Sequence, residues 1–116
     1  MDDNPIVEQT ARPYHQGLCS DATHIHTVSN PRCGDEVIIS LKLIDETIVE
    51  AWFTAVGCMV SRASASTLCH YAEGKHATQL KAMSSEDWLN INNLPLTPHR
   101  QACWALPLKA LKAAIR

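Results

Sequence analysis

Hydrophobic and polar residues alternate along two stretches in the first half of the chain. The odd positions of residues 37–43 are apolar, and residues 49–55 repeat this pattern after a short link at residues 45–46. A period of two is typical of a β-strand with one face on a core, and a short link predicts that the two strands pair back on each other. A weaker alternation in residues 23–29, which ends at Asn30, predicts a further strand. We therefore expect a small antiparallel sheet of three strands.

The spacing of apolar residues changes after Gly57 and Cys58. From Val60 to Tyr71, apolar and small residues recur every three or four positions. This spacing places them on one face of an α-helix, and Gly74 suits the left-handed position just after a helix end. The small residues of this segment would let the helix lie close to its support.

Weaker signals predict further helical segments around this helix. Residues 85–89 begin with a serine and two acids, as a capped short helix does, and residues 90–96 read as a loop. Thr97 can cap a last helix that has proline at its first position, and we expect Pro107 to interrupt and bend that helix. One or two helical turns are expected in residues 6–12. Strands first and helices after predict an α+β fold, with helices packed on one face of the sheet.

The composition is that of one ordinary folded domain. The chain has 116 residues, of which 46% are apolar and 19% are charged, so we expect residues 1–116 to form a single domain with one core. A formal net charge of −2 argues against nucleic acid or an anionic membrane as the main partner. No apolar run approaches the ~20 residues of a membrane span, and the N-terminus is acidic where a signal peptide is basic. We therefore expect a cytoplasmic protein.

Basic residues gather near the end of the chain, where the last eighteen residues contain no acid. They are Arg100, Lys109, Lys112 and Arg116. We interpret them as a solvated helix face or a docking patch for an acidic protein, rather than as a surface that reads DNA.

Five cysteines are unusual in so short a chain, and an odd number in a reducing compartment favours metal binding or thiol chemistry over disulfides. Cys33 lies in a turn beside Gly34, whose backbone freedom would let Cys33 and Asp35 converge on one point. Cys58 lies at the start of the long helix, where the helix dipole favours a thiolate. Cys103 lies near the start of the last helix. Their spacings match no zinc-finger pattern, so spacing alone leaves a metal site and buried inert thiols as comparable alternatives.

The remaining cysteines and histidines read mostly as structural or surface residues. Cys69 follows the helix-start cysteine by eleven residues, which is about 16 Å at 1.5 Å per residue, so the two cannot share one metal. Cys19 is expected to be a plain thiol. His24 and His26 share a strand face and could form a metal pair, but no third ligand is evident. His99 precedes Cys103 by four residues and is expected at the rim of that site.

Three segments resemble a known family, the iron–sulfur cluster scaffolds that comprise IscU, SufU and the N-terminal domain of NifU. They are residues 30–35 (NPRCGD), 57–66 (GCMVSRASAS) and 96–103 (LTPHRQAC). The resemblance extends from Tyr14 to Ile115. It implies an IscU-like fold, a small antiparallel sheet with helices on one side, which agrees with the pattern above.

The resemblance also implies a ligand set. The family's three ligand cysteines match Cys33, Cys58 and Cys103, and its acidic residue matches Asp35, with Gly34, His99 and Arg100 accessory to the site. IscU-like members have a histidine directly before the third cysteine, whereas Ala102 stands here. SufU-like members have Arg-x-x-Cys, which Arg100 and Cys103 match, but they also carry an insertion for which this chain has no room. The IscU chaperone motif, Leu-Pro-Pro-Val-Lys, is replaced by residues 96–100.

Two functions follow from the resemblance. The first is a non-enzymatic scaffold that receives persulfide sulfur from a cysteine desulfurase, at Cys103 or Cys33, assembles a 2Fe–2S cluster and passes it to apo acceptor proteins. The second is a zinc-bound, SufU-type sulfurtransferase that accepts sulfur from the same kind of desulfurase. Three thiolates and one carboxylate suit either the cluster or zinc. A third reading is a zinc-stabilised interaction domain without sulfur chemistry.

Overall fold

The computed structural model describes residues 14–30, 34–93 and 95–115. Three strands form one antiparallel sheet in the order β1-β2-β3, namely β1 (His24–Asn30), β2 (Asp35–Ile44) and β3 (Thr47–Val56). The three predicted strands are confirmed, each within two residues of its expected ends. The helical turns expected in residues 6–12 fall outside the described part of the chain.

The link between β2 and β3 is a two-residue hairpin turn. Ile44 pairs with Thr47, and both intervening residues have left-handed backbones, with φ of 52° at Asp45 and 66° at Glu46. A turn with two left-handed residues matches the twist of the strands that it joins, which is why it works here without glycine.

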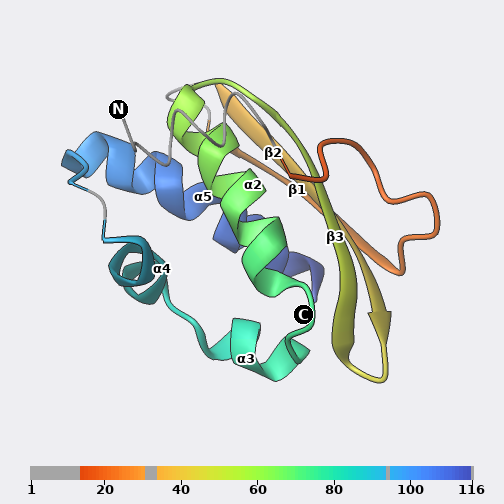
Figure 1. Ribbon diagram of the computed structural model, residues 1–116. Coiled ribbons are helices and arrows are strands. Elements are labelled where there is room, and N and C mark those ends of the chain that lie inside the picture. The colour runs from red at the N-terminus through yellow and green to blue at the C-terminus, as the bar shows by residue number, and fades with distance from the viewer. Residues whose placement is uncertain (1–13, 31–33, 94, 116) are drawn as a thin grey trace, which may run out of the picture.

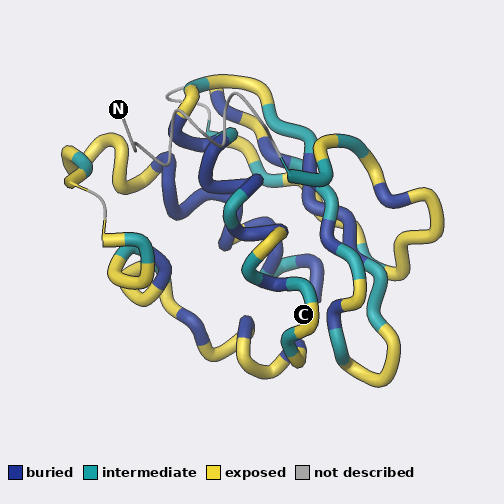
Figure 2. The backbone as a smooth tube through the Cα atoms, in the orientation of Figure 1, coloured by how far each residue is buried: buried dark blue, intermediate teal, exposed yellow. Residues whose placement is uncertain are grey.

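Four helices follow the sheet in the described part of the chain and cover one of its faces (Figure 1). They are α2 (Met59–Ala72), α3 (Ala77–Ala82), α4 (Ser85–Asn92) and α5 (Pro98–Ala114). The core lies between α2, α5 and the sheet, where Val37, Ile39 and Leu41 of β2 are fully buried (Figure 2). The predicted α+β fold, with helices on one face, is therefore confirmed.

The opposite face of the sheet is partly covered by the chain that precedes β1. The amide of Gly17 donates to the carbonyl of Phe53 at 2.6 Å, which places this segment along the outer edge of β3. Farther along, the amide of Cys19 donates to Ser40 Oγ at 3.0 Å, on the face of β2 opposite to the core. None of the described helices is long and apolar enough to cross a membrane.

Two expectations about the helices were wrong, and one short helix was not predicted. Helix α3 was missed because it has only six residues and its cap is a histidine, His76, which accepts from the Thr78 amide. Helix α4 continues to Asn92, beyond the loop start expected at residue 90. The left-handed backbone of Asn93 then ends it. Pro107 does not interrupt the last helix, since α5 is continuous from Pro98 to Ala114.

Candidate metal centre

Asp35, Cys58 and Cys103 meet at one end of the sheet. One ligand atom from each residue lies within 4.8 Å of the other two, and within the described ranges no other set of three cysteine, histidine or acidic side chains is so arranged. Asp35 is the first residue of β2, Cys58 caps the N-terminus of α2, and Cys103 lies in the second turn of α5. We call this group the Asp–Cys–Cys cluster. Asp35 and Cys103 are buried and Cys58 is half-buried.

Gly57 makes room for the Asp35 side chain. It joins β3 to α2 with a φ of +120°, a conformation that residues with a Cβ rarely adopt. A Cβ at this position would lie 2.0 Å from Asp35 Oδ1 and 2.8 Å from the Asp35 Cα. The glycine is therefore required both by the backbone of the turn and by the carboxylate that lies against it.

The Asp35 carboxylate is held at the N-terminus of α2. Its Oδ1 accepts from the Cys58 amide at 2.8 Å, while its Oδ2 accepts from the Ser61 hydroxyl at 2.8 Å and from the Cys58 thiol at 3.3 Å. Burial raises the pKa of Asp35, but these hydrogen bonds to the charged form outweigh it, so that the net pKa lies below its ordinary value. Asp35 is therefore an anion in the free protein at neutral pH.

Cys103 is 1% exposed and has the opposite electrostatic setting. Burial, followed by the neighbouring Cys58 thiol and the Asp35 carboxylate, raises the pKa of Cys103 to about 12. The thiol is thus protonated at neutral pH until a cation offsets the nearby negative charge. Metal binding at this cluster must release protons, because the thiolate is the form that binds a metal.

Pro107 also affects Cys103, through its backbone carbonyl. A proline has no N–H, so it cannot donate to the carbonyl four residues earlier in a helix, which is that of Cys103. The Ser61 hydroxyl lies 3.3 Å from this carbonyl oxygen. The sequence analysis singled out neither Ser61 nor the role of Gly57. The position of Ser61, three residues after a helix-capping cysteine, is the signal that could have found it.

The sequence assigned four further residues to the site, and the structure describes three of them, none of which is a member of the Asp–Cys–Cys cluster. The four are Cys33, Gly34, His99 and Arg100. Cys33 falls outside the described residues, and its place in the site stays a prediction. Its neighbour Gly34 has a φ of +71° and donates its amide to the Asn30 carbonyl at 2.9 Å. His99 and Arg100 are exposed in the first turn of α5, one turn before Cys103.

The thiols expected to be structural are outside the cluster. Cys69 is fully buried in α2, and burial, with the nearby charge of Glu73, raises its pKa. Cys19 is also buried and donates to Asp21 Oδ1 at 3.5 Å. His24 and His26 belong to no three-residue ligand group among the residues that the structure describes.

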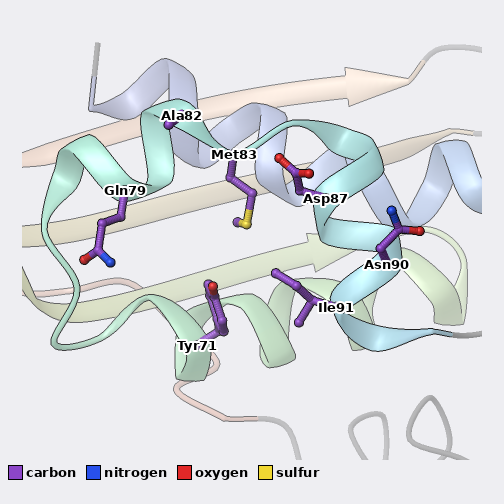
Figure 3. A pocket seen from close by; sticks show the side chains of 7 residues that line it. All are labelled: Tyr71, Gln79, Ala82, Met83, Asp87, Asn90 and Ile91. Atoms are coloured by element: carbon purple, nitrogen blue, oxygen red, sulfur yellow. The ribbon is translucent and has the colours of Figure 1, made fainter.

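Two described cavities share no residue with the Asp–Cys–Cys cluster. One, of about 530 Å³, lies between α2, α3 and α4, with Tyr71, Met83 and Ile91 facing it (Figure 3). The other, of about 410 Å³, lies between β1 and α5 and is lined by Lys109 and Lys112.

The proposed docking patch for an acidic protein stays a prediction, and Arg116 lies outside the described residues.

The donor set fits a soft metal. Two thiols and one carboxylate converge on one point, and thiolates bind zinc and iron–sulfur units in preference to magnesium or calcium. The predicted third thiol, that of Cys33, is two residues from Asp35 in sequence. The cluster can therefore offer two thiolates and a harder, weaker oxygen donor.

The chain is similar to several known proteins. The scaffold protein for iron–sulfur cluster assembly, IscU, of Thermotoga maritima is 30% identical over 127 residues, which cover 96% of this chain and 89% of that protein. The zinc-dependent sulfurtransferase SufU of Bacillus subtilis is 30% identical over 79 residues, which cover 68% of this chain but only 53% of SufU. Among solved structures, the N-terminal part of a nitrogen-fixing NifU-like protein from Brucella abortus matches with a TM-score of 0.79 at 18% identity, over 98% of this chain and 91% of that one, which confirms the fold.

The family model for the NifU-like N-terminal domain matches residues 1–116, the whole chain. Together with the Thermotoga relative, this match agrees with the resemblance found in the sequence. The chain belongs to the NifU-like N-terminal domain family.

Proposed function

We propose that this protein is a scaffold on which a 2Fe–2S cluster is assembled and from which the cluster is transferred to acceptor proteins. The observation that carries the proposal is the convergence of Asp35, Cys58 and Cys103 within 4.8 Å, in a chain related to named scaffold proteins. In this proposal Cys33 supplies the third thiolate, sulfur comes from a cysteine desulfurase, and the cluster is cargo rather than a resident cofactor.

The mixed ligand set supports transfer. Thiolates hold iron–sulfur units firmly, whereas a carboxylate is a harder and weaker ligand for them. Asp35 already has hydrogen-bond partners for both oxygens in the free protein, so it can leave the cargo without becoming an unsatisfied buried anion. We infer that Asp35 controls how readily the cluster is released, while the cysteines control whether it is bound.

The second candidate function is that of a zinc-dependent sulfurtransferase acting with a cysteine desulfurase. Two observations favour it: the match to SufU, and Arg100 three residues before Cys103, as in SufU-like members. In this alternative a zinc ion would be held by Cys33, Asp35, Cys58 and Cys103, and it would keep the thiols deprotonated at neutral pH.

Anaerobic reconstitution separates the two candidates. The full chain is incubated with ferrous iron, cysteine and a catalytic amount of desulfurase, and both visible absorbance and desulfurase turnover are followed. A stable, coloured product that activates an apo acceptor supports the scaffold. Retention of zinc, together with strong stimulation of desulfurase turnover and no coloured product, would overturn the scaffold in favour of the transferase.

A further inference from the structure

The Ser61 hydroxyl borders the Asp–Cys–Cys cluster and contacts the Asp35 carboxylate, the Cys58 thiol and the backbone of Cys103. Its Oγ is 2.8 Å from Asp35 Oδ2, 3.5 Å from Cys58 Sγ and 3.3 Å from the carbonyl oxygen of Cys103. Ser61 is fully buried in the first turn of α2. A buried hydroxyl that contacts the ligand atoms of Asp35 and Cys58 can orient them even though it is not itself a soft metal donor.

The hydroxyl has one proton and a choice of acceptors. It can donate to Asp35 Oδ2 or to the Cys103 carbonyl, but not fully to both at once. The Cys103 carbonyl is open to this bond because Pro107 cannot supply the usual helical N–H. A buried hydroxyl that loses its acceptor is costly, so a second acceptor within reach lets the first one move.

We propose that Ser61 is the positioning residue for Asp35. Its hydroxyl donates to Asp35 Oδ2 and fixes the carboxylate in the orientation from which it engages a bound metal, while the Cys103 carbonyl gives the hydroxyl a second acceptor when Asp35 moves away. This inference rests on the proposed function, because it requires the Asp–Cys–Cys cluster to bind metal. It does not depend on which of the two candidate functions is correct. Through Asp35, Ser61 governs how tightly the fourth, oxygen ligand is engaged.

Cobalt(II) titration of the full chain tests the proposal without any iron–sulfur cluster or partner protein. The absorption bands of Co²⁺ report the number of thiolates and the geometry of the site, and competition with a chelator gives the dissociation constant. Removing a group that orients a metal ligand weakens binding by about 10–100-fold. We expect Ser61→Ala to raise the Co²⁺ dissociation constant about tenfold and to shift the ligand-field bands, while the thiolate charge-transfer band keeps its intensity.

Ser64 provides the matched control. It is a buried serine on the same helix, and its hydroxyl accepts from Trp88 Nε1 at 3.0 Å and donates to the Trp104 carbonyl at 2.5 Å, away from the three ligand atoms. Ser64→Ala should lower the melting temperature and leave the Co²⁺ spectrum and affinity unchanged. Among variants at position 61, Ser61→Thr keeps the hydroxyl and should bind Co²⁺ more tightly than the isosteric Ser61→Val.

A double-mutant cycle decides whether Ser61 acts through Asp35. In the Asp35→Ala background, Ser61→Ala should cause no further loss of Co²⁺ affinity, because the group that it positions is gone. An equal loss in both backgrounds, or equal affinity of wild type and Ser61→Ala, would overturn the inference while leaving the proposed function standing. Failure of the wild-type chain to bind Co²⁺ at all would overturn both.

Discussion

Helix α2 has a hydrogen-bonded carboxylate at each end, and the two differ in the groups that surround them. At its N-terminus, Asp35 accepts from the Cys58 amide, the Cys58 thiol and the Ser61 hydroxyl. At its C-terminus, Glu73 accepts from the Ala51 amide at 3.0 Å, from the Tyr14 hydroxyl, and from His15 at 2.9 Å when Nδ1 carries the ring hydrogen. Each carboxylate joins the helix to other parts of the chain.

The difference lies in what a metal could displace. The thiol next to Asp35 can exchange its proton for a metal, so this carboxylate borders a reactive site. Glu73 is surrounded by a phenol, an imidazole and a backbone amide, and these hold the segment before β1 against β3 and α2. The same kind of anion is thus a candidate ligand at one end and an architectural link at the other. The chemistry of its neighbours separates the two roles.

The largest expected effect comes from replacing the thiols that converge at the N-terminal end of α2. Cys58→Ser and Cys103→Ser should each abolish stable binding of Zn²⁺ or of a cluster, because each removes a soft ligand from the site. We expect the same of Cys33→Ser. Anaerobic titration and metal analysis after gel filtration measure the bound metal.

Cys69→Ser is the matched control for these variants. This thiol is buried on the same helix, near Glu73 rather than Asp35. Metal content should be unchanged even though burying a hydroxyl there lowers stability. A Cys69→Ser protein that lost its metal as Cys58→Ser does would contradict the assignment of the metal site to the N-terminal end of α2.

Two glycines test how closely the Asp35 end is packed. Gly57→Ala should destabilise the fold by about 3 kcal/mol or more, since it adds an overpacked contact to a strained backbone. Its Cβ would lie 2.0 Å from Asp35 Oδ1. Gly34→Ala also falls at a positive φ, of +71°, but no atom lies within 4 Å of its Cβ, so it should cost only about 1–2 kcal/mol. Urea denaturation of the metal-free proteins measures both, and equal losses would mean that the Asp35 side chain moves freely.

Replacing each carboxylate separates release of cargo from stability. With Asp35→Ala, a reconstituted 2Fe–2S cluster should persist longer in air and pass more slowly to an acceptor. Three thiolates still hold it, and the weakest bond, through which release is proposed to begin, is gone. Glu73→Ala should lose about 1–3 kcal/mol by leaving the buried Ala51 amide without its acceptor. Its cluster should transfer at the wild-type rate.

The Asp35→Asn variant distinguishes a ligand from a helix anchor. An amide oxygen can still accept from the Cys58 amide, so Asn preserves the contact that holds the N-terminus of α2. A slower transfer rate in Asp35→Asn is expected if the carboxylate is a ligand. A rate equal to that of wild type would remove Asp35 from the ligand set.

The comparison also shows which features the sequence reveals. Period-two and period-three-or-four patterns located β2, β3 and α2, because burial of one face constrains every second or every third and fourth residue. The short α3 carries too few residues for such a pattern, and its histidine cap is an unusual one. Pro107 was misread because its effect on a helix depends on whether another donor reaches the carbonyl that it leaves open.

The residues of the site divide in the same way, into those that a local pattern reveals and those that only tertiary contacts reveal. Cys58 and Cys103 were identified from residue type and family motif, and they do converge with Asp35. Ser61 was missed because its role depends on which groups fold around it. The Glu73 link was missed too, since it joins positions 14, 51 and 73 across three parts of the chain. Contacts made by tertiary structure alone leave no periodic signal.

The smallest expected effect concerns the Tyr14 hydroxyl, which donates to Glu73 Oε1. That hydrogen bond, together with burial, raises the pKa of Tyr14 from 10.0 to about 12. Below pH 10 the phenol is protonated in both the folded and the unfolded chain, so its contribution to stability is fully present. Between pH 10 and about 12 the unfolded chain loses this proton first, and the free energy of unfolding therefore falls as the pH rises.

Tyr14→Phe isolates this contribution from those of the buried thiols, which also titrate at alkaline pH. At pH 8 we expect the variant to be less stable by about 0.5–1.5 kcal/mol, the usual net contribution of one hydrogen bond. Urea denaturation repeated from pH 8 to pH 12 should show the difference between wild type and variant shrinking as the pH approaches 12. Parallel curves over this range would mean that the Glu73 end of α2 does not depend on the phenol proton, and that its stability comes from His15 and the Ala51 amide instead.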